Sequence, residues 1–206
     1  MLQIAVFASG RGSNFIALYN FLQKENVEAK ISILISNNSN SGAIGFAKGN
    51  NIPSYYLSEK NFQSKEDYQN GMRNVLSENK INFIVLAGYM KLIAPKIVKE
   101  FENRIINIHP ALLPKFGGAG MFGERVHEAV IVASEKESGA TVHFVNEEYD
   151  RGLIILQDKV LISSDETKES LAKKVLNIEH KILPEVVKLF AENKILIKNN
   201  KVEILK

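Results

Sequence analysis

Short apolar runs alternate with longer segments in which apolar residues recur at helical spacing through the first half of the chain. The short runs predict β-strands, and the periodic segments predict amphipathic helices. The expected strands cover residues 3–9, 29–37, 52–57 and 81–89, and the expected helices cover 15–25, 41–50 and 65–79. This alternation of strand and helix predicts right-handed crossovers and an α/β fold built on a doubly wound, mostly parallel sheet.

The second half of the chain follows a different pattern. It is expected to contain a strand at 104–110, a glycine-rich loop at 115–123, a helix at 124–136, antiparallel strands at 140–147 and 153–162, and a long helix at 165–193. Asp165 or Thr167 is expected to cap the long helix, and Pro184 is expected to kink or break it. No internal repeat divides the chain, and we expect a single domain over residues 1–206.

Two polar residues, Asn107 and His109, interrupt the apolar run at 104–110. Successive side chains of a strand point to opposite faces, so these two share one face, and Pro110 stops further pairing of the strand. Ligands of doubly wound sheets bind beyond the carboxyl ends of the strands. The pair is therefore either a satisfied polar pair in the core or the working end of a site.

Composition narrows the class of protein. The chain has 206 residues, 45% of them hydrophobic, which suffices for one large core, and it contains no cysteine, which excludes disulfides and thiolate chemistry. No apolar run reaches the roughly 18 residues that cross a bilayer, and a signal peptide is not evident, so we expect a soluble, cytoplasmic protein without a membrane partner. The net charge of +3 is mild and the arginines are widely spaced, so no nucleic-acid partner is expected.

A glycine loop, ASGRGSN at residues 8–14, joins the first strand to the first helix. Gly10 and Gly12 allow a sharp turn, and the N–H groups at the start of the helix favour an anion. A dinucleotide site would need a third glycine near position 15, where the chain has Phe15, and an acidic residue at the end of the second strand, where it has Ser36 and two asparagines. The loop also lacks the lysine of a Walker loop. A phosphomonoester is therefore the expected ligand, and a tight turn without a ligand is the alternative.

The polar pair fits acyl transfer, which needs a base, an oxyanion donor and a group that orients the base. His109 and Asn107 can supply the first two. Asp150, in the predicted turn between the last two strands, is the candidate carboxylate, and pairing with it is expected to raise the pKa of His109. With no cysteine and no serine elbow, direct transfer between two bound substrates is favoured over a covalent intermediate. A structural hydrogen-bonded pair remains the alternative.

Six segments carry a resemblance to a known family: VFASGRGSN, IVLAGYMKLIAP, RIINIHPALLPKF, GATVHFV, YDRG with ILQ, and IEHKILP. In order and spacing they resemble the phosphoribosylglycinamide formyltransferases of folate-dependent purine synthesis, over nearly the whole chain. The resemblance implies the formyltransferase fold, with a phosphate-binding half at 1–100 and a catalytic and folate-binding half at 101–206. It also implies transfer of a formyl group from 10-formyltetrahydrofolate to the amine of glycinamide ribonucleotide, without a metal.

The resemblance implies particular site residues as well. Asn107 corresponds to the residue that hydrogen-bonds the formyl oxygen, His109 to the general acid/base, and Asp150 to the carboxylate that raises its pKa. The other implied contacts are Gly12, Ser13 and Asn14 with the phosphate, Glu179 with the glycinamide group, and Lys65, Met90, Lys91, Leu92 and Ile93 with the folate.

Two segments depart from the family pattern: the longer GGAGMFGERVH at 117–127, and YDRGLIILQ, where Arg151 and Leu153 replace a common glycine and proline. Transfer RNA and sugar formyltransferases, a formyltetrahydrofolate hydrolase and an inactive phosphate-binding module are alternative functions, and the chain is expected to be a monomer or homodimer. His127 is expected either to contact substrate or to be a partly exposed helix residue. His143 is expected either to lie near the site or to be a hydrogen-bonded strand residue, and His180 is expected to pack on a helix surface.

Overall fold

The computed structural model describes residues 1–205, which form two compact units. The first unit covers Met1–Ile106, and the second begins at Asn107. This division lies close to the predicted boundary between residues 100 and 101. The organisation as a single domain stays a prediction.

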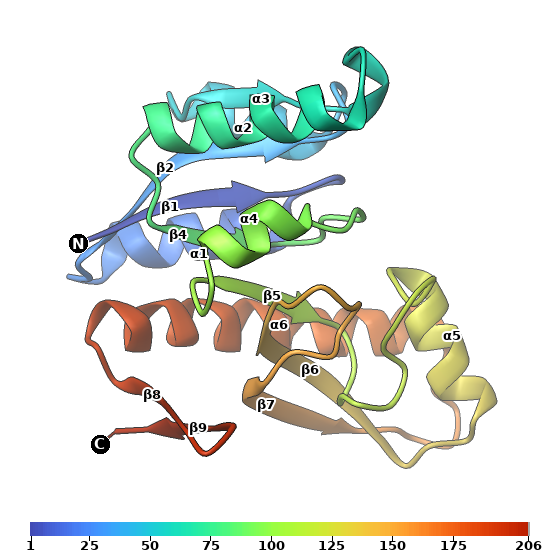
Figure 1. Ribbon diagram of the computed structural model, residues 1–206. Helices are drawn as coiled ribbons and strands as arrows, with labels where there is room; N and C mark the ends of the chain where they lie inside the picture. The colour runs from blue at the N-terminus through green and yellow to red at the C-terminus, as the bar shows by residue number, and fades with distance from the viewer. Residues whose placement is uncertain (206) are drawn as a thin grey trace. The chain divides into compact units, whose positions relative to one another are not determined.

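The first unit contains a parallel sheet whose strands alternate with helices along the chain (Figure 1). Its strands are β1 (Leu2–Phe7), β2 (Ala29–Ser36), β3 (Ser54–Tyr56) and β4 (Phe83–Leu86), and its helices are α1 (Ser13–Lys24), α2 (Gly42–Gly49), η1 (Glu59–Asn61), α3 (Lys65–Glu78) and α4 (Pro95–Glu100). β1 pairs in parallel with β2 and with β4, and β2 pairs in parallel with β3. The predicted alternation and parallel pairing are confirmed, while η1 and α4 were not predicted.

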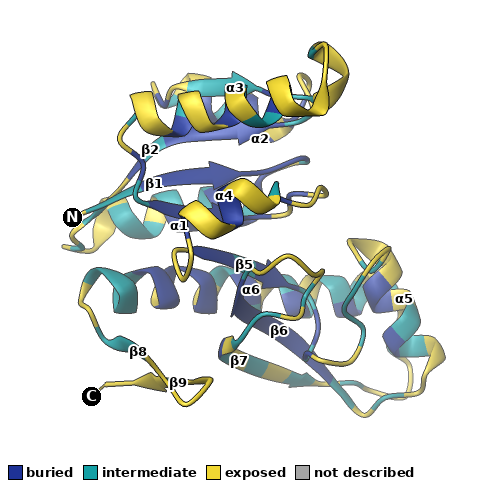
Figure 2. Ribbon diagram, viewed as in Figure 1, coloured by how far each residue is buried: buried dark blue, intermediate teal, exposed yellow. Residues whose placement is uncertain are grey.

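The core of the first unit is formed by its central strands, which are dark blue in Figure 2. Phe7, Phe15 and Phe83 are almost fully buried. α3 contributes the predicted stripe, because Tyr68, Met72 and Leu76 lie four positions apart and are its buried residues. Strands covered on both faces read as continuous apolar runs, which is why the sequence predicted this part so well.

The second unit combines a helical pair with antiparallel strands. Its elements are β5 (Ile105–His109), which starts at the end of the first unit, α5 (Glu124–Val132), β6 (Glu137–Phe144), β7 (Ile154–Leu161), α6 (Lys168–Ala191), β8 (Ile195–Lys198) and β9 (Lys201–Ile204). β6 and β7 are antiparallel, as predicted. β8 and β9 form a separate hairpin that was not predicted. Asn199 and Asn200, both with positive φ, make its turn, and paired asparagines were the available signal.

α6 is the long predicted helix, and it starts at Lys168 rather than at 165. Thr167 is its cap, with its side chain accepting a hydrogen bond from the Ser170 N–H and the Ser170 side chain reaching back. The expectation that Pro184 breaks the helix is wrong, because the helix continues through it to Ala191 with Pro184 buried. Within residues 1–205, no helix combines the length and apolar character needed to cross a bilayer.

Candidate active site

β5 carries the two polar residues that stood out in the sequence. Ile106 and Ile108 are buried, His109 is also buried, and Asn107 is half-buried. Both polar side chains reach one carboxylate, that of Asp150. The Asn107 Nδ2 atom lies 3.5 Å from Asp150 Oδ1, and the His109 Nδ1 atom lies 3.6 Å from Asp150 Oδ2. The structure therefore brings together the three side chains proposed for catalysis.

Asp150 is positioned by the connection between β6 and β7. Its backbone has a φ of 54°, a left-handed conformation that aspartate tolerates better than most residues. Gly152 lies directly against the end of β6, so closely that a Cβ atom there would overlap the carbonyl oxygen of Phe144. The Phe144 N–H donates to the Leu153 carbonyl and closes the connection. The glycine in YDRG is therefore required for the carboxylate to reach the β5 residues.

The glycine-rich loop after β5 holds both His109 and Asp150 from the backbone. The His109 Nε2–H donates to the carbonyl of Phe116 at 2.8 Å, and the Gly118 N–H donates to Asp150 Oδ2 at 2.9 Å. Gly117 leaves no room for a side chain, since a Cβ atom would lie 2.5 Å from Leu113 Cδ2 and 3.1 Å from Asp150 Cβ. The segment at 117–127, which departs most from the family pattern, thus contains the N–H that holds Asp150 and directly follows the carbonyl that holds His109.

The segment between β5 and this loop is fixed by two polar side chains of the β6–β7 pair. The Thr141 hydroxyl donates to the Ala111 carbonyl at 2.6 Å and accepts from the Leu113 N–H at 3.1 Å. Gln157 Nε2 donates to the Leu113 carbonyl at 3.0 Å and to the Thr141 hydroxyl at 2.8 Å. These four hydrogen bonds set the path of the backbone that leads from His109 to Phe116.

His143 on β6 is a further member of the cluster. Its Nδ1 atom lies 2.8 Å from the Phe144 carbonyl, and its Nε2 atom lies 3.0 Å from Asn107 Nδ2 and 3.5 Å from Asp150 Oδ1. The ring is buried. The sequence left open whether His143 lies near the site or is a structural strand residue, and the structure places it in contact with both Asn107 and Asp150.

The protonation of the cluster differs in one respect from expectation. Burial lowers the pKa of His109, and this effect outweighs the neighbouring Asp150 carboxylate and the Phe116 carbonyl, which act to raise it. The predicted rise in the pKa of His109 is therefore wrong in direction, although Asp150 contributes with the expected sign. Burial acts to raise the pKa of Asp150, but neighbouring groups outweigh burial and lower it, among them the charge of His109 and the Gly118 N–H.

His127 on α5 is buried, not partly exposed, and its Nδ1 atom has no hydrogen-bond partner. Burial lowers the pKa of His127, and the nearby His109 lowers it further. Two buried imidazoles therefore stay neutral in the folded protein near neutral pH. At a pH below 6.5, the ordinary pKa of histidine, each ring would take up a proton when the protein unfolds.

This burial predicts how stability depends on pH. The pKa values of His109 and His127 in the folded protein lie below 6.5. Their contribution to the free energy of unfolding is therefore fully present above pH 6.5 and is lost as the pH falls towards the folded values. We expect the Tm to fall between about pH 7 and pH 5, and His127→Gln to make this fall shallower. Thermal unfolding at several pH values measures it, with Arg125→Gln on the exposed side of α5 as control. An unchanged pH dependence in His127→Gln would contradict neutral burial.

The first unit carries the glycine loop at the start of α1. Gly12 has a φ of 80°, and a Cβ atom there would lie 2.8 Å from Ala43 Cβ and 3.0 Å from Ala43 Cα, so glycine is required. α1 begins at Ser13 without a side-chain cap, which leaves its first N–H groups available for a ligand. Asn14 is 8% exposed, and its Oδ1 atom is buried without a hydrogen-bond partner.

The residues implied in folate binding also belong to the first unit. Met90, Lys91 and Leu92 are exposed after β4, whereas Ile93 is buried. The Met90 N–H donates to the Ser9 hydroxyl at 3.0 Å, which ties this segment to the backbone that follows β1. Lys65 is the exposed first residue of α3. Glu179, implied in glycinamide binding, is buried on α6 in the second unit.

The family model for formyl transferases matches residues 2–187. The chain belongs to the formyl transferase family. Phosphoribosylglycinamide formyltransferase from Haemophilus influenzae is 36% identical over 200 residues, which are 97% of this chain and 92% of that protein. The chloroplastic phosphoribosylglycinamide formyltransferase of Arabidopsis thaliana is 40% identical over 198 residues, which are 94% of this chain but 66% of that protein. The chain thus spans slightly less than two thirds of that plant relative.

Solved structures of formyl transferases agree with the fold. Glycinamide ribonucleotide transformylase 1 from Symbiobacterium toebii matches with a TM-score of 0.93 and 31% identity, over 100% of this chain and 95% of that one. The predicted α/β formyltransferase fold, mostly parallel with an antiparallel C-terminal part, is confirmed.

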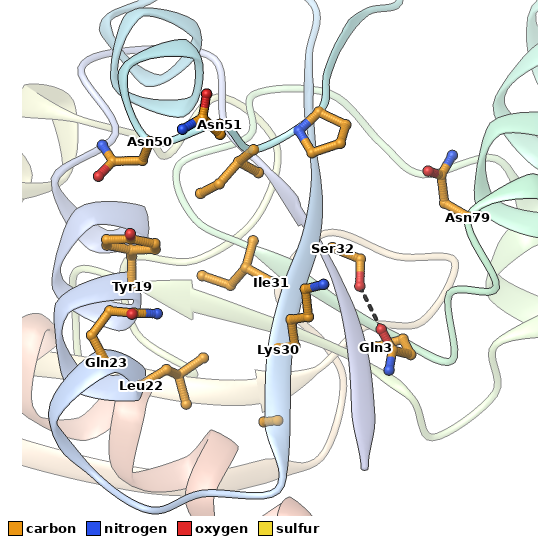
Figure 3. A pocket seen from close by; sticks show the side chains of 13 residues that line it. Gln3, Tyr19, Leu22, Gln23, Lys30, Ile31, Ser32, Asn50, Asn51 and Asn79 are labelled. Carbon is orange, nitrogen blue, oxygen red and sulfur yellow. Dashed lines mark hydrogen bonds between the residues drawn. The ribbon is translucent and has the colours of Figure 1, made fainter.

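A separate cavity of about 580 Å³ lies in the first unit, lined by residues that include Tyr19, Lys30, Ile31 and Asn79 (Figure 3). It opens beside the first residues of β2 and the end of α3, at the amino ends of the parallel strands. Formyl transferases, like other parallel α/β proteins, are expected to bind ligands at the opposite, carboxyl ends of the strands. None of the predicted site residues lines this cavity, and we do not assign it to the reaction.

Sequence reasoning missed the backbone groups of the candidate site. The Phe116 carbonyl and the Gly118 N–H carry no side-chain signal, and only the glycine-rich composition of the loop marked them. Within residues 1–205, no group of three or more histidine, aspartate or glutamate side chains is arranged to hold a metal ion.

Proposed function

We propose that the protein transfers the formyl group of 10-formyltetrahydrofolate to the amine of 5′-phosphoribosylglycinamide, a step of purine biosynthesis. The observation that carries the proposal is the buried cluster of Asn107, His109 and Asp150 in a chain that belongs to the formyl transferases. The Haemophilus and Arabidopsis relatives bear the name of this activity. As a cytoplasmic monomer or homodimer, the protein would need only these two small-molecule substrates and no metal.

His109 is the proposed proton carrier, and its surroundings determine which nitrogen acts. A carbonyl oxygen can only accept, so the contact with Phe116 requires a proton on Nε2. In the neutral ring the lone pair is then on Nδ1, beside Asp150. The lowered pKa of His109 keeps this nitrogen free to accept a proton, and the lowered pKa of Asp150 keeps its carboxylate ionised to stabilise the imidazolium that forms.

The reaction proceeds through a tetrahedral intermediate. The glycinamide amine attacks the formyl carbon, the C=O electron pair moves to the oxygen, and an Asn107 N–H stabilises the oxyanion. His109 Nδ1 accepts the proton that the amine loses. The bond between the formyl carbon and N10 of the folate then breaks, and His109 returns its proton to N10. The products are formylglycinamide ribonucleotide and tetrahydrofolate, with no net change in protonation.

The remaining predicted residues are proposed to bind the substrates. Gly12, Ser13 and Asn14 would hold the ribose phosphate through the free N–H groups of α1 and the Nδ2–H of the Asn14 amide. Glu179 would approach the glycinamide group. Lys65 and residues 90–93 would contact the folate, with the exposed Met90 and Leu92 side chains packing on its rings.

The deciding experiment measures tetrahydrofolate release by the purified protein. Release is expected only when both 10-formyltetrahydrofolate and glycinamide ribonucleotide are present. Release without the ribonucleotide would identify a hydrolase instead. Binding of both compounds without any release would identify an inactive binding module.

The phosphate site gives a separate prediction. Asn14→Ala is expected to raise the KM for glycinamide ribonucleotide about tenfold, because a hydrogen bond to a charged group is worth roughly 1.5–3 kcal/mol. The kcat and the KM for the folate should change less than about threefold, since the phosphate is remote from the reacting carbon. Steady-state kinetics measure this, with Asn20→Ala on the exposed face of α1 as control. An unchanged KM for the ribonucleotide would show that the loop is only structural.

A further inference from the structure

His143 is the buried group of the cluster that the proposed reaction does not use. It is as deeply buried as His109, and its two ring nitrogens face different partners. The Phe144 carbonyl lies 2.8 Å from Nδ1, and the Asn107 amide nitrogen lies 3.0 Å from Nε2. Both contacts have normal hydrogen-bond length. Together they determine where the ring carries its proton.

The tautomer follows from what each partner can do. The Phe144 carbonyl has no hydrogen to donate, so Nδ1 must carry the proton. The NH2 group of Asn107 has no lone pair to offer, so Nε2 must be unprotonated and accept from it. The longer contact of 3.5 Å from Nε2 to Asp150 would require a proton on Nε2, which would oppose the Asn107 N–H. The shorter contact therefore decides in favour of the neutral Nδ1–H form.

This form of His143 fixes the orientation of the Asn107 amide. One N–H of the amide is directed to Nε2, and the other lies on the side of Asp150, whose Oδ1 atom is 3.5 Å from Nδ2. At that distance the second N–H is not fully engaged by the carboxylate. A rotation of the amide by 180° would place its oxygen against the Nε2 lone pair and against the carboxylate, and both contacts would be repulsive.

We propose that His143 is a positioning residue, an inference that rests on the proposed function. Its Nε2 lone pair holds the Asn107 amide so that an N–H of the amide, and not its carbonyl oxygen, faces the formyl oxygen. Without this acceptor, only the longer contact with Asp150 would oppose a turn of the amide. Its oxygen would then face the developing oxyanion and repel it. His143 thus acts on the transition state through Asn107, without itself touching substrate.

Two variants separate this role from simple packing. In His143→Gln, the side-chain oxygen can reach the place of Nε2 and accept from Asn107. In His143→Asn, the shorter side chain can still donate to the Phe144 carbonyl, but Asn107 loses its acceptor. We expect kcat to fall about 30-fold in His143→Asn and less than about fivefold in His143→Gln, with both KM values changed less than about threefold. A missing oxyanion donor itself costs roughly 100- to 1,000-fold, which sets the upper limit.

A double variant provides the second kinetic readout. Once Asn107→Ala has removed the amide, adding His143→Asn should lower kcat by less than about twofold, because the two residues act as one unit. A packing role would instead lower kcat by the same factor in both backgrounds. Equal kcat values for His143→Asn and the wild type, or equal losses in the Asn and Gln variants, would overturn the proposal.

The protonation state can be measured without turnover. Nitrogen NMR of the histidine rings in the wild-type protein at neutral pH should show His143 with a protonated Nδ1 and an unprotonated Nε2, with the ring signals assigned through their couplings to the backbone of the same residue. A protonated Nε2 would overturn the proposal even if the variants failed to fold. If the wild type transferred no formyl group at all, the proposed function would fail, and the positioning role with it, while the same spectrum would still test the His143–Asn107 contact.

Discussion

Replacing His109 with alanine is expected to lower kcat about 1,000-fold, with the KM values for both substrates changed by less than about threefold. His109 is the group whose Nδ1 lone pair carries the proton between the attacking amine and the leaving nitrogen, and no other described imidazole occupies its place beside Phe116 and Asp150. Steady-state kinetics with each substrate varied in turn measure both constants. A kcat within about tenfold of the wild type would remove His109 from the mechanism.

Asp150→Asn tests the same proton transfer through the partner of His109. The amide cannot pair with the imidazolium, so kcat is expected to fall about 100-fold. Loss of the neighbouring charge also removes a contribution that raises the pKa of His109, so the residual activity should persist to lower pH than in the wild type. The control is Asp158→Asn, because Asp158 is a carboxylate of β7 that pairs with Lys181 at 3.1 Å outside the cluster. A similar loss in Asp158→Asn would point to damage of the β6–β7 pair instead.

The second large effect is expected on stability, from Gly152→Ala. The added Cβ atom would overlap the carbonyl oxygen of Phe144, a backbone atom that cannot rotate away as a side chain can. We expect a loss of about 3 kcal/mol or more of unfolding free energy, which lowers the Tm by roughly 6–12 °C for a chain of this size. Thermal or urea unfolding measures the change.

The matched control for this prediction is Gly45→Ala on α2. No atom lies within 4 Å of the position that its Cβ atom would take, and alanine favours a helix by up to about 1 kcal/mol. The Tm should therefore stay the same or rise. Because the Phe144 carbonyl also accepts from His143, any folded Gly152→Ala protein is expected to lose turnover as well. A wild-type Tm in Gly152→Ala would mean that the connection after Asp150 moves freely enough to absorb a methyl group.

Much of the fold could be read from the sequence because it rests on local patterns. The apolar run at 81–89 and the α3 stripe of Tyr68, Met72 and Leu76 each encode burial by their own spacing. Both elements form as predicted, although β4 covers only Phe83–Leu86 of the expected strand. The predictions that were wrong or missing have two different causes. The β8–β9 hairpin is short and rich in lysine, and Pro184 is tolerated within α6 because packing of the surrounding buried residues outweighs its helix-breaking tendency.

The candidate site divides in the same way. From the sequence, strand periodicity placed Asn107 and His109 on one face, and residue chemistry selected Asp150 as the carboxylate. The direction of the His109 pKa shift required tertiary structure, because burial there opposes the effects of the Asp150 carboxylate and the Phe116 carbonyl, which come from separate segments. The same holds for the proton on each ring nitrogen, which is fixed by the carbonyl groups of Phe116 and Phe144.

The sequence by itself determined the fold class, the family and the three side chains proposed for the chemistry, since these depend on periodicity and on motifs that are contiguous in the chain. Only the tertiary structure decided how those side chains are held. The Phe116 carbonyl and the Gly118 N–H belong to one loop and the His143 ring belongs to β6, and a backbone group has the same chemistry whatever residue carries it. Their positions depend on how the chain folds, which no local sequence pattern predicts.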